Sequence, residues 1–126
     1  MRMEIQFTAR ELDVMTVLWD RGPSTVTEVR RALSDELAYT TVLTVLRILE
    51  EKGYVDHTPD GRAHRYRPLV ERAAAGDSAL RRLTKRLFSG SPELLLTRLV
   101  DDQDLSEEEL RRMKDLLSKR LGEEDQ

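Results

Sequence analysis

The chain has 126 residues, of which 36% are charged and 39% hydrophobic, and a formal net charge of −3; this length suits one compact domain with an appendage, and the composition indicates a soluble, helix-rich protein. No apolar run reaches the length of a membrane span and no leader-like segment opens the chain, so we expect a cytoplasmic protein without membrane contact. The absence of cysteine excludes disulfides, thiolate metal sites and thiol redox sensing.

Two helices are expected in the first part of the chain, because each begins with a capping box. Residues 8–11 (Thr-Ala-Arg-Glu) open the first helix, and Arg21-Gly22-Pro23 ends it. Residues 25–28 (Thr-Val-Thr-Glu) open a second, short helix. Apolar residues recur at helical spacing in both: Leu12, Met15, Leu18 and the expected core anchor Trp19 in the first, and the inward-facing Val26, Val29, Ala32 and Leu33 in the second.

A third helix is predicted over residues 39–52, and its two sides differ in character. At 100° per residue the apolar positions gather on one side as a core stripe, formed by Val42, Val45, Leu46 and Leu49. Short threonine side chains on the other side let a helix enter a major groove, where hydroxyls bond bases or phosphates and methyls contact thymine. The candidate DNA-contacting residues of this helix are Thr40, Thr41, Thr44 and Arg47.

A two-stranded hairpin is predicted directly after this helix. Gly53 ends the helix as a left-handed cap, and segments 54–58 and 63–67 alternate in character around an Asp-Gly turn at residues 59–61. No acidic residue occurs from residue 61 to residue 70, so the hairpin offers cations to a phosphate backbone. The candidate phosphate contacts on this basic wing are Arg62, His64, Arg65 and Arg67.

The order helix, extended link, helix, turn, helix and hairpin is that of a winged helix-turn-helix. We therefore expect a mostly α-helical protein with a small antiparallel β wing, in which residues 1–69 form a DNA-binding domain and residues 70–126 a helical dimerisation region. Taken singly, an amphipathic helix is more often an ordinary surface helix, and hairpin arginines more often protect a strand edge. The collinear order of the elements is what favours DNA binding.

Leucine recurs at helical spacing after the wing, where turns become few. We expect one helix that begins near Val70 or Asp77, a second that Ser91-Pro92 begins, and a third that begins with a capping box at residues 106–109. Their leucine faces exceed what a monomer easily hides, so a homodimer is predicted. Its expected interface residues are Leu94, Leu95, Leu99, Leu110, Met113 and Leu117. The alternatives are helices that fold back on the amino-terminal domain, or a different partner protein.

Several segments in one order also resemble a known family. They are residues 12–15 with 18–19, 25–29 and above all 38–46 (Ala-Tyr-Thr-Thr-Val-Leu-Thr-Val-Leu), followed by Leu49, 52–55 and 62–66. In these segments the chain resembles the penicillinase repressor family of bacterial transcriptional regulators. The resemblance implies a dimeric repressor that binds a near-palindromic DNA operator, with the third helix in the major groove and the wing along the backbone.

Two properties of branches of that family are not matched here. The copper-responsive branch carries a cysteine-rich motif at its carboxyl end, and this chain has no cysteine. The β-lactam branch is inactivated by cleavage of an Asn-Phe bond in the dimer region, where this chain has Arg98-Leu99. Release of repression by a sensor protease is therefore one alternative, and the sequence names neither the inducing signal nor the regulated genes.

Catalysis finds little support, because the chain lacks a Gly-rich phosphate loop, a Gly-x-Ser-x-Gly motif and a His-Glu-x-x-His motif. With two histidines and no cysteine, we expect no metal site, and we expect no cofactor. The predicted function is a dimeric transcriptional repressor that binds a palindromic operator. The net charge of −3 argues mildly against it, since DNA-binding domains are often basic. The alternatives are a winged-helix protein-interaction module that does not bind DNA, and a DNA-architectural protein without sequence preference.

Overall fold

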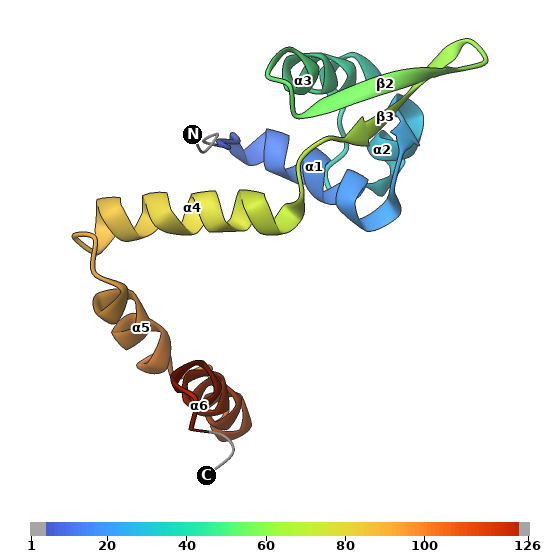
Figure 1. The fold of residues 1–126 in the computed structure, drawn as a ribbon. Helices are drawn as coiled ribbons and strands as arrows, with labels where there is room; N and C mark the ends of the chain where they lie inside the picture. Colours follow the sequence, from blue (N-terminus) through green and yellow to red (C-terminus); the bar gives the residue numbers. More distant parts are fainter. Residues whose placement is uncertain (1–4, 124–126) are drawn as a thin grey trace. The chain divides into compact units, whose positions relative to one another are not determined.

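The computed structural model describes residues 5–123, in which helices alternate with one small sheet (Figure 1). The chain packs as two compact units, one that extends to Leu80 and one that begins at Arg81. The elements are α1 (Ala9–Arg21), β1 (Ser24–Thr25), α2 (Val26–Ala32), α3 (Tyr39–Glu51), β2 (Val55–Asp60), β3 (Ala63–Pro68), α4 (Arg72–Leu87), α5 (Pro92–Val100) and α6 (Glu107–Leu121). The predicted fold class, mostly α-helical with a small antiparallel β wing, is confirmed.

The predicted capping boxes begin α1, α2 and α6. In α1 the Thr8 hydroxyl accepts from the Glu11 N–H at 3.1 Å, and the Glu11 carboxylate accepts from the Thr8 N–H at 2.8 Å. Each box satisfies two of the N–H groups that a helix start leaves without a partner. A cap of this kind stabilises a helix by about 1 kcal/mol, so these starts are specified locally.

The strands form one antiparallel sheet in the order β1-β3-β2, and β2 with β3 is the predicted wing. The predicted position of the turn was wrong: β2 continues through Pro59 and Asp60, and Gly61 and Arg62 connect the strands. Gly61 has a φ of +62°, as the first central residue of a type II′ turn requires. Pro59 is tolerated because β2 is an edge strand, where a missing N–H need not break the ladder.

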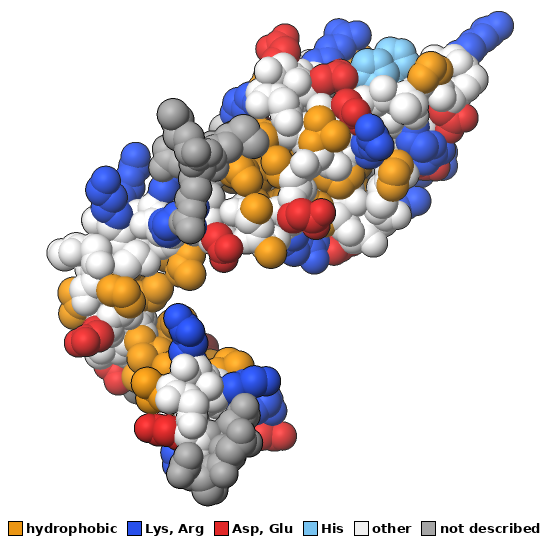
Figure 2. All heavy atoms as spheres, viewed as in Figure 1, with side chains coloured by type: hydrophobic (Ala, Val, Ile, Leu, Met, Phe, Trp, Pro, Cys, Tyr) orange, Lys and Arg blue, Asp and Glu red, His pale blue; other side chains and the backbone are white. Residues whose placement is uncertain are grey.

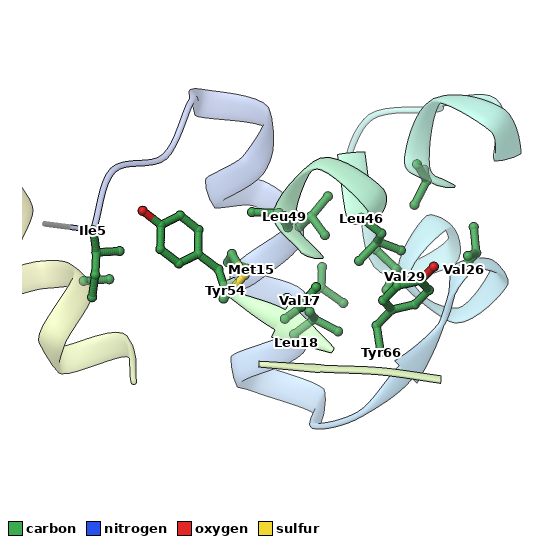
Figure 3. Close-up of a cluster of buried hydrophobic side chains, with 14 residues drawn as sticks. Ile5, Met15, Val17, Leu18, Val26, Val29, Leu46, Leu49, Tyr54 and Tyr66 are labelled. Carbon is green, nitrogen blue, oxygen red and sulfur yellow. The ribbon is translucent and has the colours of Figure 1, made fainter. Parts of the chain in front are cut away.

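The core of the first unit lies between α1, α2, α3 and the sheet (Figure 3). Met15, Leu18 and Leu46 are fully buried there, together with Tyr66 of β3. Leu12 and Ala32, in contrast, are exposed. Leu12 lies about 100° around α1 from the buried Glu11. Ala32 is the last residue of α2, and Leu33, which follows it, has an extended backbone.

The first half of α4 belongs to the winged-helix unit. The buried Ser78 hydroxyl donates to the Ile5 carbonyl at 3.0 Å and accepts from the Ile5 N–H at 3.2 Å. Trp19, half-buried rather than fully buried, donates its indole N–H to the Val70 carbonyl at 2.9 Å. Compact packing therefore ends inside α4, while the division of functions expected at residue 69 stays a prediction.

The second unit contains the end of α4 together with α5 and α6. The Ser91 hydroxyl caps α5 by accepting from the Leu94 N–H at 3.3 Å, and Pro92 occupies the first helical position. On α6 Arg111 pairs with Glu107 at 2.6 Å. Neither α5 nor α6 has a buried residue in the described chain. In residues 5–123, no helix combines the length and apolar character that crossing a bilayer requires.

Glu11 is a buried carboxylate that joins α1 to the end of α3. Its two oxygens lie 2.9 and 2.8 Å from Lys52 Nζ. Burial opposes the ionisation of Glu11, but the bonds from the Lys52 ammonium and the Thr8 N–H outweigh it and lower the pKa of the carboxyl below its usual value. Ionised Glu11 therefore stabilises the fold.

We predict that Glu11→Gln lowers the free energy of unfolding at neutral pH by about 1–2 kcal/mol, because a charge-assisted bond to a partly exposed ammonium is lost. A lowered pKa stabilises the fold above the unfolded-state pKa, and this contribution is lost as the pH falls through the folded-state pKa. Urea unfolding at several pH values checks this: variant and parent should converge below about pH 4. A constant difference down to about pH 3 would contradict the assignment.

Candidate nucleic-acid interface

The outer side of α3 carries the four predicted contact residues in exposed positions. Thr40, Thr41, Thr44 and Arg47 are all exposed. The side that faces the core holds three fully buried residues, Val42, Leu46 and Leu49, while Val45 is half-buried. The predicted core stripe is thus confirmed in its main members, and its burial leaves Thr40 and Thr44 on the opposite side of the helix, with Thr41 on the flank.

The threonine hydroxyls are not equivalent as hydrogen-bonding groups. The Thr44 hydroxyl donates to the Thr40 carbonyl at 2.9 Å, so its proton is engaged in the helix backbone. A ligand would find an acceptor oxygen and a methyl group at Thr44. The hydroxyls of Thr40 and Thr41 make no hydrogen bond within the described residues, and they retain both donor and acceptor capacity.

The start of α3 differs from the starts of α1, α2, α5 and α6. Ala38 precedes the helix, no side chain caps it, and the first turn contains no acid. Free N–H groups at a helix start favour an anion such as a phosphate. A hollow of about 530 Å³ beside this start is lined by Arg30 and Arg31, and also by the acids Asp35 and Glu36. Cations that could bind a DNA backbone are therefore present here, but the carboxylates of Asp35 and Glu36 partly offset their positive charge.

Two of the four predicted contact residues on the wing form no ion pair within the described residues. The β2–β3 hairpin projects beyond the helices of the first unit (Figure 1). Arg62 is exposed in its turn, and it forms no ion pair within residues 5–123. His64 is exposed on β3 and stacks on His57 of β2, with ring centroids 4.1 Å apart. Both side chains are accessible to a phosphate.

Arg65 is engaged within the protein. Its guanidinium donates to Asp60 Oδ2 at 2.7 and 3.1 Å, to Glu28 Oε1 at 2.8 Å and to the Pro23 carbonyl at 3.1 Å. The pKa of Arg65 is raised by Asp60 and then by Glu28. The pKa of Glu28 is lowered by the Thr25 N–H and then by Arg65. Arg65 therefore connects the wing to the capping box of α2.

Arg67 is also paired, through two bonds to Asp56 on the neighbouring strand. Nε lies 2.6 Å from Asp56 Oδ1 and Nη2 lies 2.9 Å from Oδ2. This guanidinium is the main cause that lowers the pKa of the Asp56 carboxyl. Sequence reasoning considered only the acid-free stretch of β3 and missed the acids of β2. Pairing the two predicted strands would have found them, since Asp56 lies directly opposite Arg67.

The predicted dimer-interface residues lie on α5 and α6, where the described chain provides no core to cover them. Leu94, Leu99 and Leu117 are 49%, 48% and 50% exposed. The other three, Leu95, Leu110 and Met113, are half-buried. Exposed apolar side chains that form a contiguous patch mark interaction surfaces, whereas single ones are common on any protein.

Residues 7–119 match the sequence model of the family described as Penicillinase repressor. The match begins just before α1 and ends within α6, so it includes the winged helix and the helices that follow it. This extent confirms the family expected from the motifs around residues 38–46.

Two relatives illustrate the similarity. Transcriptional regulator BlaI of Mycobacterium tuberculosis is 52% identical over 62 residues, which are 47% of this chain and 45% of that protein. This chain thus matches less than half the length of that relative. Methicillin resistance regulatory protein MecI of Staphylococcus aureus is 20% identical over 117 residues, which are 91% of this chain and 95% of that protein.

One solved structure resembles the winged-helix unit. It is Bacillus licheniformis BlaI in its monomeric form, in complex with the blaP half-operator. The TM-score is 0.50 at 29% sequence identity, over 59% of this chain and 93% of that chain. The sequence match, the winged-helix fold and this likeness agree, and the chain belongs to the penicillinase repressor family of transcriptional regulators.

Proposed function

We propose that this protein is a dimeric transcriptional repressor that binds a palindromic DNA operator, with α3 in the major groove and the wing along the backbone. The observation that carries the proposal is the exposed outer side of α3, where Thr40, Thr41 and Thr44 precede Arg47. Short hydroxylated side chains followed by a guanidinium suit base edges and phosphates in a major groove. Such a repressor acts on DNA in the cytoplasm.

The likeness to a repressor bound to DNA supports the proposal. Bacillus licheniformis BlaI was solved with the blaP half-operator. For the present chain we propose two winged helices on two half-sites, whose centres lie roughly 34 Å apart or a multiple of that distance. The exposed leucines of α5 and α6 are the proposed contact between the two copies, because a two-fold interface needs one self-complementary apolar surface.

The proposed DNA contacts divide into two groups by their bonds within the protein. Arg47, Arg62 and His64 are exposed, and we assign them to phosphates or base edges. Arg65 and Arg67 were predicted in the same role, but each would first have to leave a carboxylate. We therefore assign them to holding the wing in shape.

Release of the operator is proposed to follow a signal that remains to be identified, with β-lactam-linked proteolysis as one form of it. Arg98 and Leu99, which occupy the place of the cleaved bond in the β-lactam branch, lie inside α5. A protease that binds extended substrate would cut there only after local unwinding of that helix.

The neutralised wing is the one observation that favours a second function, a winged-helix module that binds proteins instead of DNA. Two of three wing arginines are paired with acids, and the whole chain carries a net charge of −3. Gel shift with the DNA upstream of the chain's own gene, and with a duplex enriched from a randomised pool, distinguishes the two functions. Failure to enrich any duplex at low salt would exclude the repressor.

We predict that Thr41→Ala and Thr44→Ala each weaken operator binding by about 1–3 kcal/mol, the usual value of a base contact, with little loss of stability because both residues are exposed. Thr44→Val should retain more affinity than Thr44→Ala, because the methyl is kept and the hydroxyl proton was engaged in the backbone. Thr16→Ala is the matched control, since its hydroxyl makes the same bond on α1, to the Leu12 carbonyl at 2.8 Å. Unchanged affinity in both alanine variants would remove α3 from the interface.

We predict different salt dependences for two wing variants. Arg62→Ala should weaken binding to every duplex and reduce the slope of log affinity against log salt by about 1, because one phosphate contact is lost. Arg65→Ala should weaken binding through a less ordered wing while the slope stays near that of the parent. Titrations at several salt concentrations check both expectations. Equal slopes for Arg62→Ala and the parent, or a reduced slope for Arg65→Ala, would reverse the two assignments.

We predict that Leu99→Asp combined with Leu117→Asp makes the protein monomeric, because two charges enter a surface proposed to be buried between copies. Sedimentation at micromolar concentration measures this, and operator affinity should fall with it. Arg112→Asp introduces the same side chain on the opposite side of α6 and should leave the dimer intact. A dimer that persists in the double variant would place the interface elsewhere.

A further inference from the structure

The end of α4 carries a dense group of positive charges. Residues 81–86, which we call the basic segment, contain four cations, and no acidic residue occurs from Ser78 to Pro92. Arg81, Lys85 and Arg86 are exposed, and none of them forms an ion pair within the described chain. The proposed DNA contacts on α3 and the wing do not include these side chains, so the basic segment has no role in the proposed function so far.

A group of negative charges follows α5. Residues 101–109, which we call the acidic segment, contain six acidic residues and no cation. Asp101, Asp102 and Asp104 are exposed, and none of them is joined to a cation within the part of the chain that the structure describes. The Asp102 carboxylate accepts from the Asp104 N–H at 2.9 Å, as in an Asx turn. The acidic segment therefore begins with a folded turn whose carboxylates lie at the surface.

The position of the first two acids is unfavourable without a cation beside them. Asp101 is the C-cap of α5, and Asp102 follows it directly. The carboxyl end of a helix carries a partial negative charge, which cations stabilise and carboxylates destabilise. Arg98 lies in the last turn of α5, yet it forms no ion pair with either acid in the described chain. A cation from outside the chain would remove this repulsion.

Exposed leucines accompany the charges. On α4, Leu83 and Leu87 are 40% and 71% exposed, and they lie about 40° apart around the helix. Arg86 lies about 60° to one side of Leu83, and Arg81 about 120° to the other side of Leu87, so cations flank the leucines. Figure 2 shows hydrophobic side chains gathered over α5 and α6, with charged side chains beside them. An apolar centre with a charged rim is typical of a protein interface.

The charges of the second unit are paired locally on α6, and not between its helices. Glu107 pairs with Arg111 at 2.6 Å and Glu108 with Arg112 at 3.2 Å, each one turn apart. The exposed cations of the basic segment and the first acids of the acidic segment belong to the same unit, but no ion pair joins them there. A second copy brings the same two segments, and a two-fold axis can place each of them against its opposite.

We propose that, in the repressor dimer, the basic segment of one copy contacts the acidic segment of the other, and that this pairing of opposite charges selects the copy against which the leucines pack. The inference rests on the dimer of the proposed function and adds a charged contact to it. Two-fold symmetry makes the contact form twice. Charges at the rim of an interface mainly decide which partner is accepted and how fast it is found.

Charge reversal of one segment at a time tests the contact. In the first variant, Arg81→Glu/Arg86→Glu, two glutamates face the acids of the other copy. In the second variant, Asp101→Lys/Asp104→Lys, two lysines face the cations of the other copy. A mixed dimer of the two variants has one contact as in the parent and one in which the new glutamates face the new lysines. Opposite charges therefore meet at both contacts of the mixed dimer.

We expect each variant alone to dimerise about tenfold more weakly than the parent, since attraction at both contacts becomes repulsion. An equal mixture should form a mixed dimer about as stable as that of the parent. Sedimentation at about 0.15 M salt measures this, with a dye on one variant through a cysteine added at the amino end, because the chain has no cysteine of its own. Thermal unfolding of each protein monitors the fold.

The matched control is Arg21→Glu/Arg31→Glu, which changes the net charge as the first variant does but at exposed positions of the first unit. It should dimerise as the parent does, and it should not form a preferred mixed dimer with the second variant. This control separates a contact between two segments from a general effect of net charge on association.

Several results would overturn the inference while the proposed function stands. They are unchanged dimerisation in both variants, variants that dissociate but do not combine when mixed, and recovery only when all four substitutions are in one chain, which would place the ion pairs within a copy. Loss of operator affinity by the first variant with its dimer intact would assign the basic segment to DNA and also remove the proposal. A parent protein that is monomeric at micromolar concentration would overturn the dimer of the proposed function together with this contact.

Discussion

The burial of one side of α3 is the interaction on which the rest of the molecule depends. Val42, Leu46 and Leu49 are fully enclosed within the core of the first unit, and this fixes the rotation of α3 about its own axis. Because successive residues are 100° apart, the same rotation decides that the threonines and Arg47 face outward. A core shifted by one residue would turn a leucine or a valine to the surface. Core packing therefore presents the proposed contact surface, and the threonines only supply its chemistry.

On the wing, the same arginines can either form ion pairs within the protein or contact DNA. Arg65 and Arg67 are bonded to carboxylates that lie opposite or beside them, and these bonds tie together the two strands of a hairpin with an unpaired edge. Each bond that orders the wing also removes a cation from the potential that would attract DNA. The ion pairs of Arg65 and Arg67 thus help to hold the shape of the wing. The arginines that we assign to DNA are Arg62 in the turn and Arg47 on the outer side of α3.

Much of the fold could be predicted from the sequence because its signals are local. A capping box such as Thr8 with Glu11 involves four consecutive residues, and the stripe of α3 needs only the helical period. The wing turn was misplaced because the Asp-Gly pair resembles a turn centre, whereas Gly61 alone has the positive φ. For the candidate site, exposure could be predicted, but the bonds of Arg65 could not. The bonds of Arg65 to Glu28 and to the Pro23 carbonyl join residues 37 and 42 positions apart in sequence, through a packing of β3 against the start of α2 that no local pattern specifies.

The helices after the wing show the limit of local signals most clearly. Ser91 begins α5 and a capping box begins α6, so both helices are specified as firmly as α1. Yet α1 has five buried residues and these two have none in the described chain, although each carries leucines along one side. Short helices are marginal without packing. The sequence therefore specifies elements that bury no residue within the described chain, and we propose that a second copy, which carries the same apolar pattern by symmetry, covers them.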